Sequence, residues 1–208
     1  MGIFSSQKSC LGVDIGSFGI KIVELKNEAG KARLSSYGFS EAKTVEDKDA
    51  RKNDIDYMAA LINKILADSG MTSREAVAAL PTFSVFSSII NLSNVSNLSQ
   101  KDLESAVYWE AKKVIPLPLE EMKLYWQEIE DSGPKDNKKI FLTGAPKVLV
   151  NRYIEIFKKA QINLLSLETE THSLARALLG NDKSIVMIVE IGANTTDIAV
   201  VDASIPVL

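Results

Sequence analysis

Two segments of the chain alternate apolar and polar residues on either side of a turn that contains glycine. Residues 11–25 read LGVDIGSFGIKIVEL, and residues 185–202 read IVMIVEIGANTTDIAVVD. Each pattern predicts a β-hairpin whose incoming strand carries an acidic residue two positions before the glycine of the turn. Residues 32–42, ARLSSYGFSEA, predict a further strand that extends the first hairpin into a meander.

Between the hairpins, apolar residues recur at the spacing of helices in four segments. A helix over residues 55–66 would bury Ile55, Met58, Ala59, Ile62, Ile65 and Leu66 on one face. Three more helices are predicted, over residues 100–114 with a start at Ser99 and Asp102, over 149–160, and over 171–179 with an end at Gly180. Further strands are predicted over residues 75–80, 85–92, 123–129, 139–146 and 162–168.

The order of these elements predicts an α/β fold with an insertion. Residues 82–166 give the order strand, helix, strand, strand, helix, strand, which is enough for a small α/β subdomain. We therefore expect a core built from residues 1–81 and 167–208, with residues 82–166 as the inserted subdomain. The two glycine hairpins form a weak internal repeat within the expected core.

Composition narrows the class of protein. The chain has 208 residues, of which 46% are hydrophobic and 25% charged, as in ordinary folded proteins. Its net charge of −3 and the lack of a lysine or arginine run exclude nucleic acid as an expected partner. Cys10 is the single cysteine and is expected to be a buried thiol. No segment has the roughly 18–20 consecutive apolar residues of a membrane span.

The two hairpin turns have the residue types of a phosphate site. A glycine after a strand lets the backbone approach a ligand, and consecutive N–H groups in a tight turn bind anions. Ser17, Asn194, Thr195 and Thr196 could add side-chain donors, and Asp14 could hold Mg²⁺ through water. We expect the two turns to come from adjacent strand pairs of one sheet and to face the same space, where they would grip a polyphosphate.

Motifs for other chemistries are missing from the sequence. It has no GxxxxGK[ST] or GxGxxG loop, no CxxC pair and no HExxH. His172 is the single histidine and lies in a predicted helix among apolar residues, so a packed or surface role is expected. We assign no catalytic residue.

The two turns resemble the phosphate-1 and phosphate-2 motifs of the actin-like ATPase superfamily. Four segments together resemble the PilM family of type IV pilus assembly proteins, which is related to the cell-division protein FtsA. They are residues 11–25, residues 106–127 with AVYWEAKKVIPLPLEEMKLYWQ, residues 170–179 with ETHSLARALL, and residues 189–201 with VEIGANTTDIAVV. The resemblance implies an actin-like, ribonuclease-H-like core with the inserted FtsA/PilM-type subdomain.

The resemblance also implies a function and a set of binding residues. It implies a cytoplasmic ATP-binding adaptor, peripheral to the inner membrane, that binds the N-terminal tail of a PilN-type protein in a groove between core and inserted subdomain. Other pilus assembly platform proteins, or a second copy of the chain, would be further partners. Residues 85–92 and 117–121 are the expected groove walls. The implied nucleotide-binding residues are Asp14, Gly16, Ser17, Phe18, Glu190, Gly192, Ala193, Asn194, Thr195 and Thr196, with Asp14 as the metal-side acid.

Two departures from the family pattern change these expectations. Glu190 stands where the family usually has aspartate, and its extra methylene shifts the carboxylate by roughly 1.5 Å. The chain also ends soon after the second hairpin, so we expect the second lobe to be absent and the binding of ATP and Mg²⁺ to be weak or absent. Whether the chain is an enzyme stays open. Alternatives are an actin-like ATPase, a sugar-kinase-type phosphotransferase fragment or an FtsA-like division protein.

Overall fold

The computed structural model describes residues 9–16, 18–41, 55–95, 97–129, 136–180, 182–192, 195–202 and 205–207. The chain divides into two compact units. Unit 1 comprises Met1–Pro81, Asn151–Ser173 and Ile191–Thr196, and unit 2 comprises Thr82–Val150, Leu174–Glu190 and Asp197–Leu208. In the described part of unit 1, Cys10 is buried, as expected.

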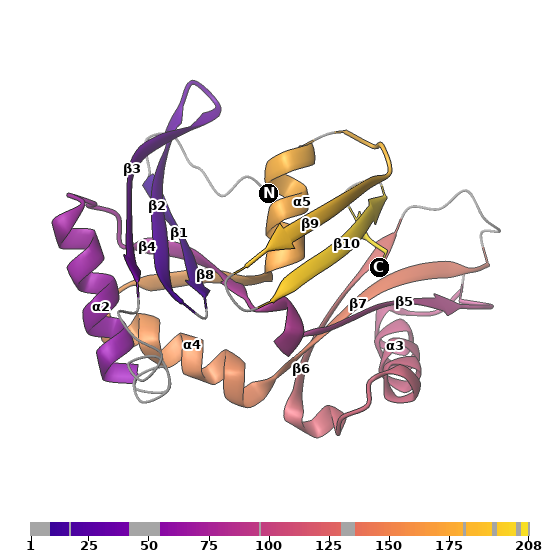
Figure 1. Cartoon of the computed structure of the whole chain (residues 1–208). Helices are drawn as coiled ribbons and strands as arrows, with labels where there is room; N and C mark the ends of the chain where they lie inside the picture. Colours follow the sequence, from indigo (N-terminus) through magenta and orange to yellow (C-terminus); the bar gives the residue numbers. More distant parts are fainter. Residues whose placement is uncertain are drawn as a thin grey trace. The chain divides into compact units, whose positions relative to one another are not determined.

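Unit 1 contains a five-stranded mixed sheet in the order β3-β2-β1-β4-β8 (Figure 1). Its strands are β1 (Ser9–Gly16), β2 (Gly19–Glu28), β3 (Lys31–Glu41), β4 (Glu75–Leu80) and β8 (Asn163–Thr169). The first three form an antiparallel meander, as the alternating pattern predicts. β4 pairs with β1 in parallel and β8 with β4 in parallel, because each is reached through a helix.

The helix α2 (Ile55–Asp68) connects β3 to β4 and buries the face that its sequence predicts. Its buried residues are Met58, Ala59, Ile62, Ile65 and Leu66. Gly70, at φ +64°, ends the helix, with hydrogen bonds from Gly70 N–H to the Ala67 carbonyl and from Met71 N–H to the Leu66 carbonyl. This is the Schellman arrangement, in which a left-handed residue closes the last turn.

α2 lies very close to β3 at Gly38. A Cβ atom built on Gly38 would lie 2.1 Å from Ser69 Oγ and 2.8 Å from Ile65 Cγ2. A side chain at this position would force the side chains of Ser69 and Ile65 to move. Glycine at this position therefore sets how closely the helix packs on the sheet.

Unit 2 contains a three-stranded antiparallel sheet in the order β5-β7-β6, covered by α3. Its elements are β5 (Phe86–Leu92), α3 (Gln100–Val114), β6 (Met122–Ile129) and β7 (Lys138–Pro146), with short 3-10 turns at Thr82–Ser84 and Leu119–Glu121. Ser99 caps α3 by accepting a hydrogen bond from Asp102 N–H at 3.2 Å, as predicted. The core between α3 and the sheet consists of Ile90, Leu92, Val95, Leu103, Val107, Ala111, Ile115, Leu119, Met122, Ile140 and Leu142.

Two strand placements differ from the expectations. β8, which the sequence analysis assigned to the inserted subdomain, pairs with β4 in the five-stranded sheet. The second hairpin, β9 (Val186–Ile191) and β10 (Thr196–Asp202), forms a separate three-stranded sheet with β11 (Ile205–Pro206). The expectation that both glycine hairpins belong to one sheet is therefore wrong. β1 is paired on both sides, with β2 and with β4, so the second hairpin cannot pair directly with β1.

The helices α4 (Lys147–Lys159) and α5 (Glu170–Leu179) flank β8 in the sequence. α4 turns directly into β8 through residues 160–162, where Ile162 N–H bonds to the Phe157 carbonyl at 2.9 Å. Tyr153, Ile156 and Phe157 are the buried residues of α4, as its apolar spacing predicts.

Candidate functional site

The carboxyl ends of β1, β4 and β8 meet at one edge of the five-stranded sheet, because the three strands are parallel. Ligands of open α/β sheets bind at such an edge. Asp14 is in register with Ala79, and Ala79 is in register with Glu168. Their side chains therefore share one face of the sheet, with the two acids about 10 Å apart between Cα atoms at a strand spacing of ~4.8 Å. The small Ala79 leaves space between the acids.

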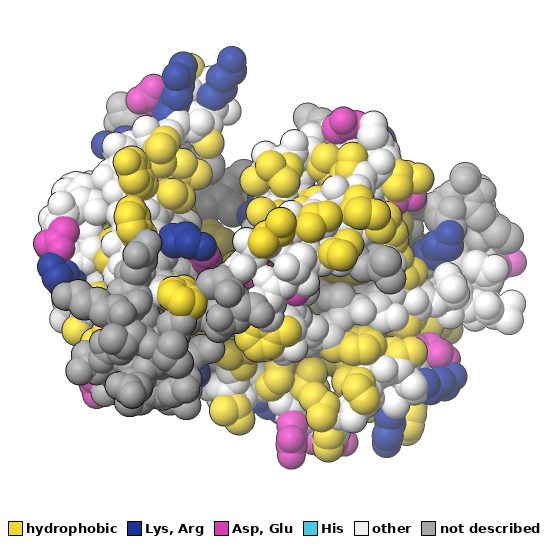
Figure 2. All heavy atoms as spheres, viewed as in Figure 1, with side chains coloured by type: hydrophobic (Ala, Val, Ile, Leu, Met, Phe, Trp, Pro, Cys, Tyr) yellow, Lys and Arg dark blue, Asp and Glu magenta, His cyan; other side chains and the backbone are white. Residues whose placement is uncertain are grey.

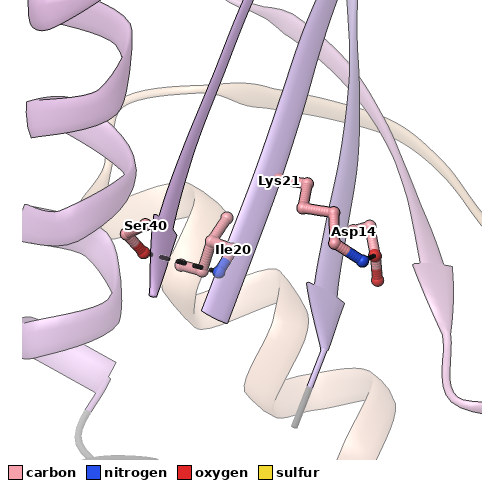
Figure 3. A network of polar contacts seen from close by, with 4 residues as sticks. All are labelled: Asp14, Ile20, Lys21 and Ser40. Atoms are coloured by element: carbon pink, nitrogen blue, oxygen red, sulfur yellow. Dashed lines mark hydrogen bonds and ion pairs between the residues drawn. The ribbon is translucent and has the colours of Figure 1, made fainter. Parts of the chain in front are cut away.

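Lys21 is the register partner of Asp14 on β2, and the two side chains form an ion pair (Figure 3). Lys21 Nζ lies 3.1 Å from Asp14 Oδ2, with the lysine side chain 73% and the aspartate side chain 38% exposed. An exposed pair of this kind contributes at most about 1 kcal/mol, so Asp14 can exchange its partner readily. In the same view, Ser40 Oγ accepts a hydrogen bond from Ile20 N–H at 3.4 Å.

The first turn follows Asp14 and joins β1 to β2. Gly16 pairs with Gly19, and Phe18 is 41% exposed at the tip. A Cβ on Gly16 would lie 3.5 Å from the Gly19 carbonyl oxygen, an ordinary contact. The fold of the turn therefore tolerates a side chain at this position, and a need for glycine would come from a ligand. Ser17 lies outside the described residues.

The second turn joins β9 to β10 and is tight around Gly192. Gly192 N–H bonds to the Thr195 carbonyl at 2.9 Å, and a Cβ on Gly192 would lie 3.1 Å from that oxygen. Glu190 lies near the end of β9, and Thr196 begins β10. Ala193 and Asn194 lie outside the described residues. The division into units cuts this hairpin, because Ile191–Thr196 falls in unit 1 while the chain before it, through Glu190, and after it, from Asp197, falls in unit 2.

The sequence analysis did not predict three residues near this edge of the sheet as site residues, namely Tyr153, Glu168 and Glu170. Tyr153 on α4 is 4% exposed. Its pKa is raised above its ordinary value first by burial and then by the charges of Glu170 and Asp14. Glu168 Oε2 accepts a hydrogen bond from Ser173 Oγ at 3.1 Å. Glu168 and Glu170 could have been predicted from the segment LSLETE, because they lie at the carboxyl end of a strand that follows a helix.

Within the described ranges, no group of three or more histidine, cysteine, aspartate or glutamate side chains is placed to hold a metal ion. Two acids of the sheet edge, Asp14 and Glu168, would have to be joined by ligand oxygens or water to complete a Mg²⁺ shell. Among the described helices, none has the length and apolar character that crossing a membrane requires.

The family model for type IV pilus assembly protein PilM matches residues 12–207. The chain belongs to the PilM family. This confirms the family resemblance inferred from the two turns and the tryptophan-containing helix.

Comparison with solved structures gives the same fold. The PilM chain of a PilM-PilN type IV pilus biogenesis complex matches with a TM-score of 0.78 and 20% sequence identity, over 95% of this chain and 59% of that chain. This member of the PilM family therefore spans about three-fifths of the length of the solved PilM chain. The match confirms the predicted α/β fold class.

Two other solved structures are more distant. A Bacteroides thetaiotaomicron protein with an actin-like ATPase fold and unknown function has a TM-score of 0.46 and 9% identity, over 100% of this chain and 72% of that chain. An Aquifex aeolicus PPX-GPPA enzyme has a TM-score of 0.39 and 10% identity, over 96% of this chain and 50% of that chain. Similarity at this level carries no conclusion about function.

Proposed function

We propose that this PilM family member is an adaptor of type IV pilus assembly that binds the N-terminal cytoplasmic segment of a PilN-type membrane protein. The observation that carries the proposal is the likeness of 95% of the chain to the PilM chain solved in complex with PilN. Such a partner would hold the adaptor at the cytoplasmic face of the inner membrane. In this proposal, α3 and the sheet β5-β7-β6 form the inserted subdomain.

A strand edge in unit 2 suits an extended peptide. Among the described strands, β5 pairs with β7 alone, so its other edge presents backbone N–H and C=O groups. β5 is one of the two groove walls expected from the sequence. An added strand would take its affinity from main-chain hydrogen bonds and its selectivity from alternate side chains. Ser87 and Asn91, both exposed on β5, would flank that peptide.

A calorimetric titration tests the proposal, with the N-terminal peptide of the PilN-type protein from the same genome as the ligand. Saturable binding by the wild type is expected. The variant S87K/N91K should bind at least tenfold more weakly, because lysines on an edge strand oppose strand addition. The matched control is Y125K on the other edge strand, β6, where Tyr125 is 62% exposed. Absence of binding by the wild type, or equal loss in both variants, would contradict the proposal.

Nucleotide binding is a second candidate function, at the two glycine turns. In each turn a glycine stands at or directly after the end of a strand, Gly16 on β1 and Gly192 after β9, which is a backbone arrangement suited to binding anions. Asp14 would hold Mg²⁺ through water, and the backbone N–H groups of both turns would bind phosphate oxygens. Calorimetry with Mg-ATP is expected to show weak binding by this chain, and micromolar affinity would contradict that expectation.

A further inference from the structure

β3 is an edge strand of the five-stranded sheet in unit 1 (Figure 1). Among the described strands it pairs with β2 alone, so in that part of the chain no strand pairs with its other edge. Residues 34–40 of β3, LSSYGFS, include no proline and no charged residue. Natural proteins usually protect a free edge with such residues, because its N–H and C=O groups can pair with another strand.

The strand register shows which residues of β3 direct backbone groups to this free edge. The β1-β2 hairpin has a two-residue loop, so its closing residue on β2, Gly19, hydrogen-bonds to β1. Successive residues of a strand alternate between its two neighbours, so Ile22 bonds to β3, where its register partner is Gly38. Tyr37 and Phe39, on either side of Gly38, therefore point their N–H and C=O groups outward.

The two faces of β3 differ around Gly38. Gly38 faces α2, where a Cβ atom would contact Ser69 and Ile65. Side chains alternate between the faces of a strand, so Tyr37 and Phe39 lie on the face away from α2, where they are 67% and 61% exposed. An unpaired edge beside two exposed aromatic side chains suits the addition of a strand that carries apolar residues at alternate positions.

We propose that two copies of this chain pair through β3, antiparallel and with the two-fold axis at Gly38. In this register, Tyr37 of each copy lies opposite Phe39 of the other, and the outward N–H and C=O groups of these residues form about four hydrogen bonds between the copies. Cross-strand aromatic pairs stabilise a sheet, and Gly38 opposite Gly38 adds no side chain on the face that α2 covers. The surface is self-complementary, as a two-fold contact requires.

A β-bulge limits the length of this pairing. Ser35 has no register partner on β2, and a bulge of this kind bends the strand, so contact is confined to residues 36–41 and Leu34 lies outside it. The basic residues Lys31 and Arg33 of two antiparallel copies lie at opposite ends of the pair, so their like charges do not meet. So short a contact buries less than the roughly 1,200 Å² of a standard interface, and we expect a weak dimer with a dissociation constant on the order of 10–100 μM.

Sedimentation velocity of the full chain, from about 5 μM to about 1 mM, tests the inference. Wild type should shift from the mass of one chain, 22.8 kDa, toward twice that mass as concentration rises. Y37K/F39K should associate at least tenfold more weakly, because lysines on an edge strand oppose strand addition. The matched control is L34K, since Leu34 is 59% exposed on the same strand beyond the bulge, and it should associate like wild type.

Oxidative cross-linking tests the register without lysine substitutions. A mixture of Y37C and F39C should give severalfold more disulfide-linked dimer than either variant alone, because only the unlike positions lie opposite each other. Cys10 is buried and does not compete. Equal cross-linking in the mixture and in the single variants would overturn the inference.

Three further outcomes would also overturn it. They are a wild type that stays monomeric at the highest concentration, a Y37K/F39K variant that associates as wild type does, and loss of the PilN-type peptide in Y37K/F39K. The last result would assign this edge to the peptide. The adaptor function is tested separately by the S87K/N91K titration, so it can stand if the dimer fails.

Discussion

The carboxylate of Glu24 accepts a hydrogen bond from the backbone N–H of Ser73 at 2.8 Å, although Glu24 is only 1% exposed. The same oxygen accepts from Thr72 N–H and Thr72 Oγ, each at 3.3 Å. These bonds fix the segment that leads into β4 against β2. A buried carboxylate is thus held by donors of the backbone.

Protonation of Glu24 should weaken unit 1 at acidic pH. Burial by itself raises the pKa of Glu24, but the hydrogen bonds outweigh it, the strongest being from Ser73, and hold the pKa below the ordinary value of 4.5. A lowered pKa gives stability that is present above the unfolded-state pKa and lost as pH falls through the folded-state pKa. Urea unfolding should show this loss below about pH 4.5 in wild type, while E24Q, about 1–2 kcal/mol less stable at neutral pH, lacks it.

The control for this prediction is E28Q, because Glu28 is an exposed acid of the same strand. E28Q should follow the wild-type pH profile. An E24Q profile that matches the wild type throughout the acidic range would refute a role for Glu24 in the pH dependence.

Gly38→Ala should destabilise unit 1, because its Cβ would clash with Ser69 Oγ and Ile65 Cγ2 of α2. The expected loss is about 1–3 kcal/mol, which lowers the melting temperature by about 2–4 °C per kcal/mol. The double variant G38A/S69A should recover part of the loss, since it removes the closer clashing atom. No recovery would mean that the clash with Ile65 accounts for most of the loss.

Asp14→Asn should separate stability from ligand binding. The Asp14–Lys21 pair is exposed, so its loss should change the free energy of unfolding by less than about 1 kcal/mol. Any Mg²⁺-dependent part of nucleotide binding should disappear, because the amide cannot hold the cation as a carboxylate does. Chemical unfolding checks the effect on stability, and titrations of ATP with and without Mg²⁺ check the effect on binding. A loss of several kcal/mol would show that Asp14 is structural.

Met187→Lys should be nearly neutral for stability. Met187 is 66% exposed on β9 and belongs to a row of exposed apolar side chains with Ile185, Val189 and Ile191 (Figure 2). Surface substitutions usually change the free energy of unfolding by less than about 0.5 kcal/mol. Val201→Ala, at a fully buried position of β10, should instead cost about 2 kcal/mol. Similar losses of unfolding free energy in both variants would show that Met187 is buried in solution.

Local pattern was enough to predict most elements of the fold. The helical spacing of α2 gives its buried residues, and Ser99 with Asp102 gives the start of α3. Both signals depend on residues a few positions apart in the chain. The ends of strands and the presence of both hairpins follow in the same way from glycines and alternating apolar residues.

Strand partnership was where sequence reasoning failed. The apolar run of β8 fits equally well in either sheet, and only the closure of a long connection places it beside β4. The separate sheet of β9 and β10 was missed for the same reason. Tyr153 carried no site signal, because the charges of Asp14 and Glu170 reach it only when α4 folds back along β8.

The parallel pairing of β4 with β1 and of β8 with β4 also affects the order in which the sheet can form during synthesis on the ribosome. Strands β1, β2 and β3 can join as soon as they leave the exit tunnel, because their partners are neighbours in sequence. β4 must then wait for the much later β8, and contacts between distant segments form slowly. Until β8 has been made, the edge of β4 is open to pairing with other nascent chains, so we expect aggregation to compete with folding during synthesis.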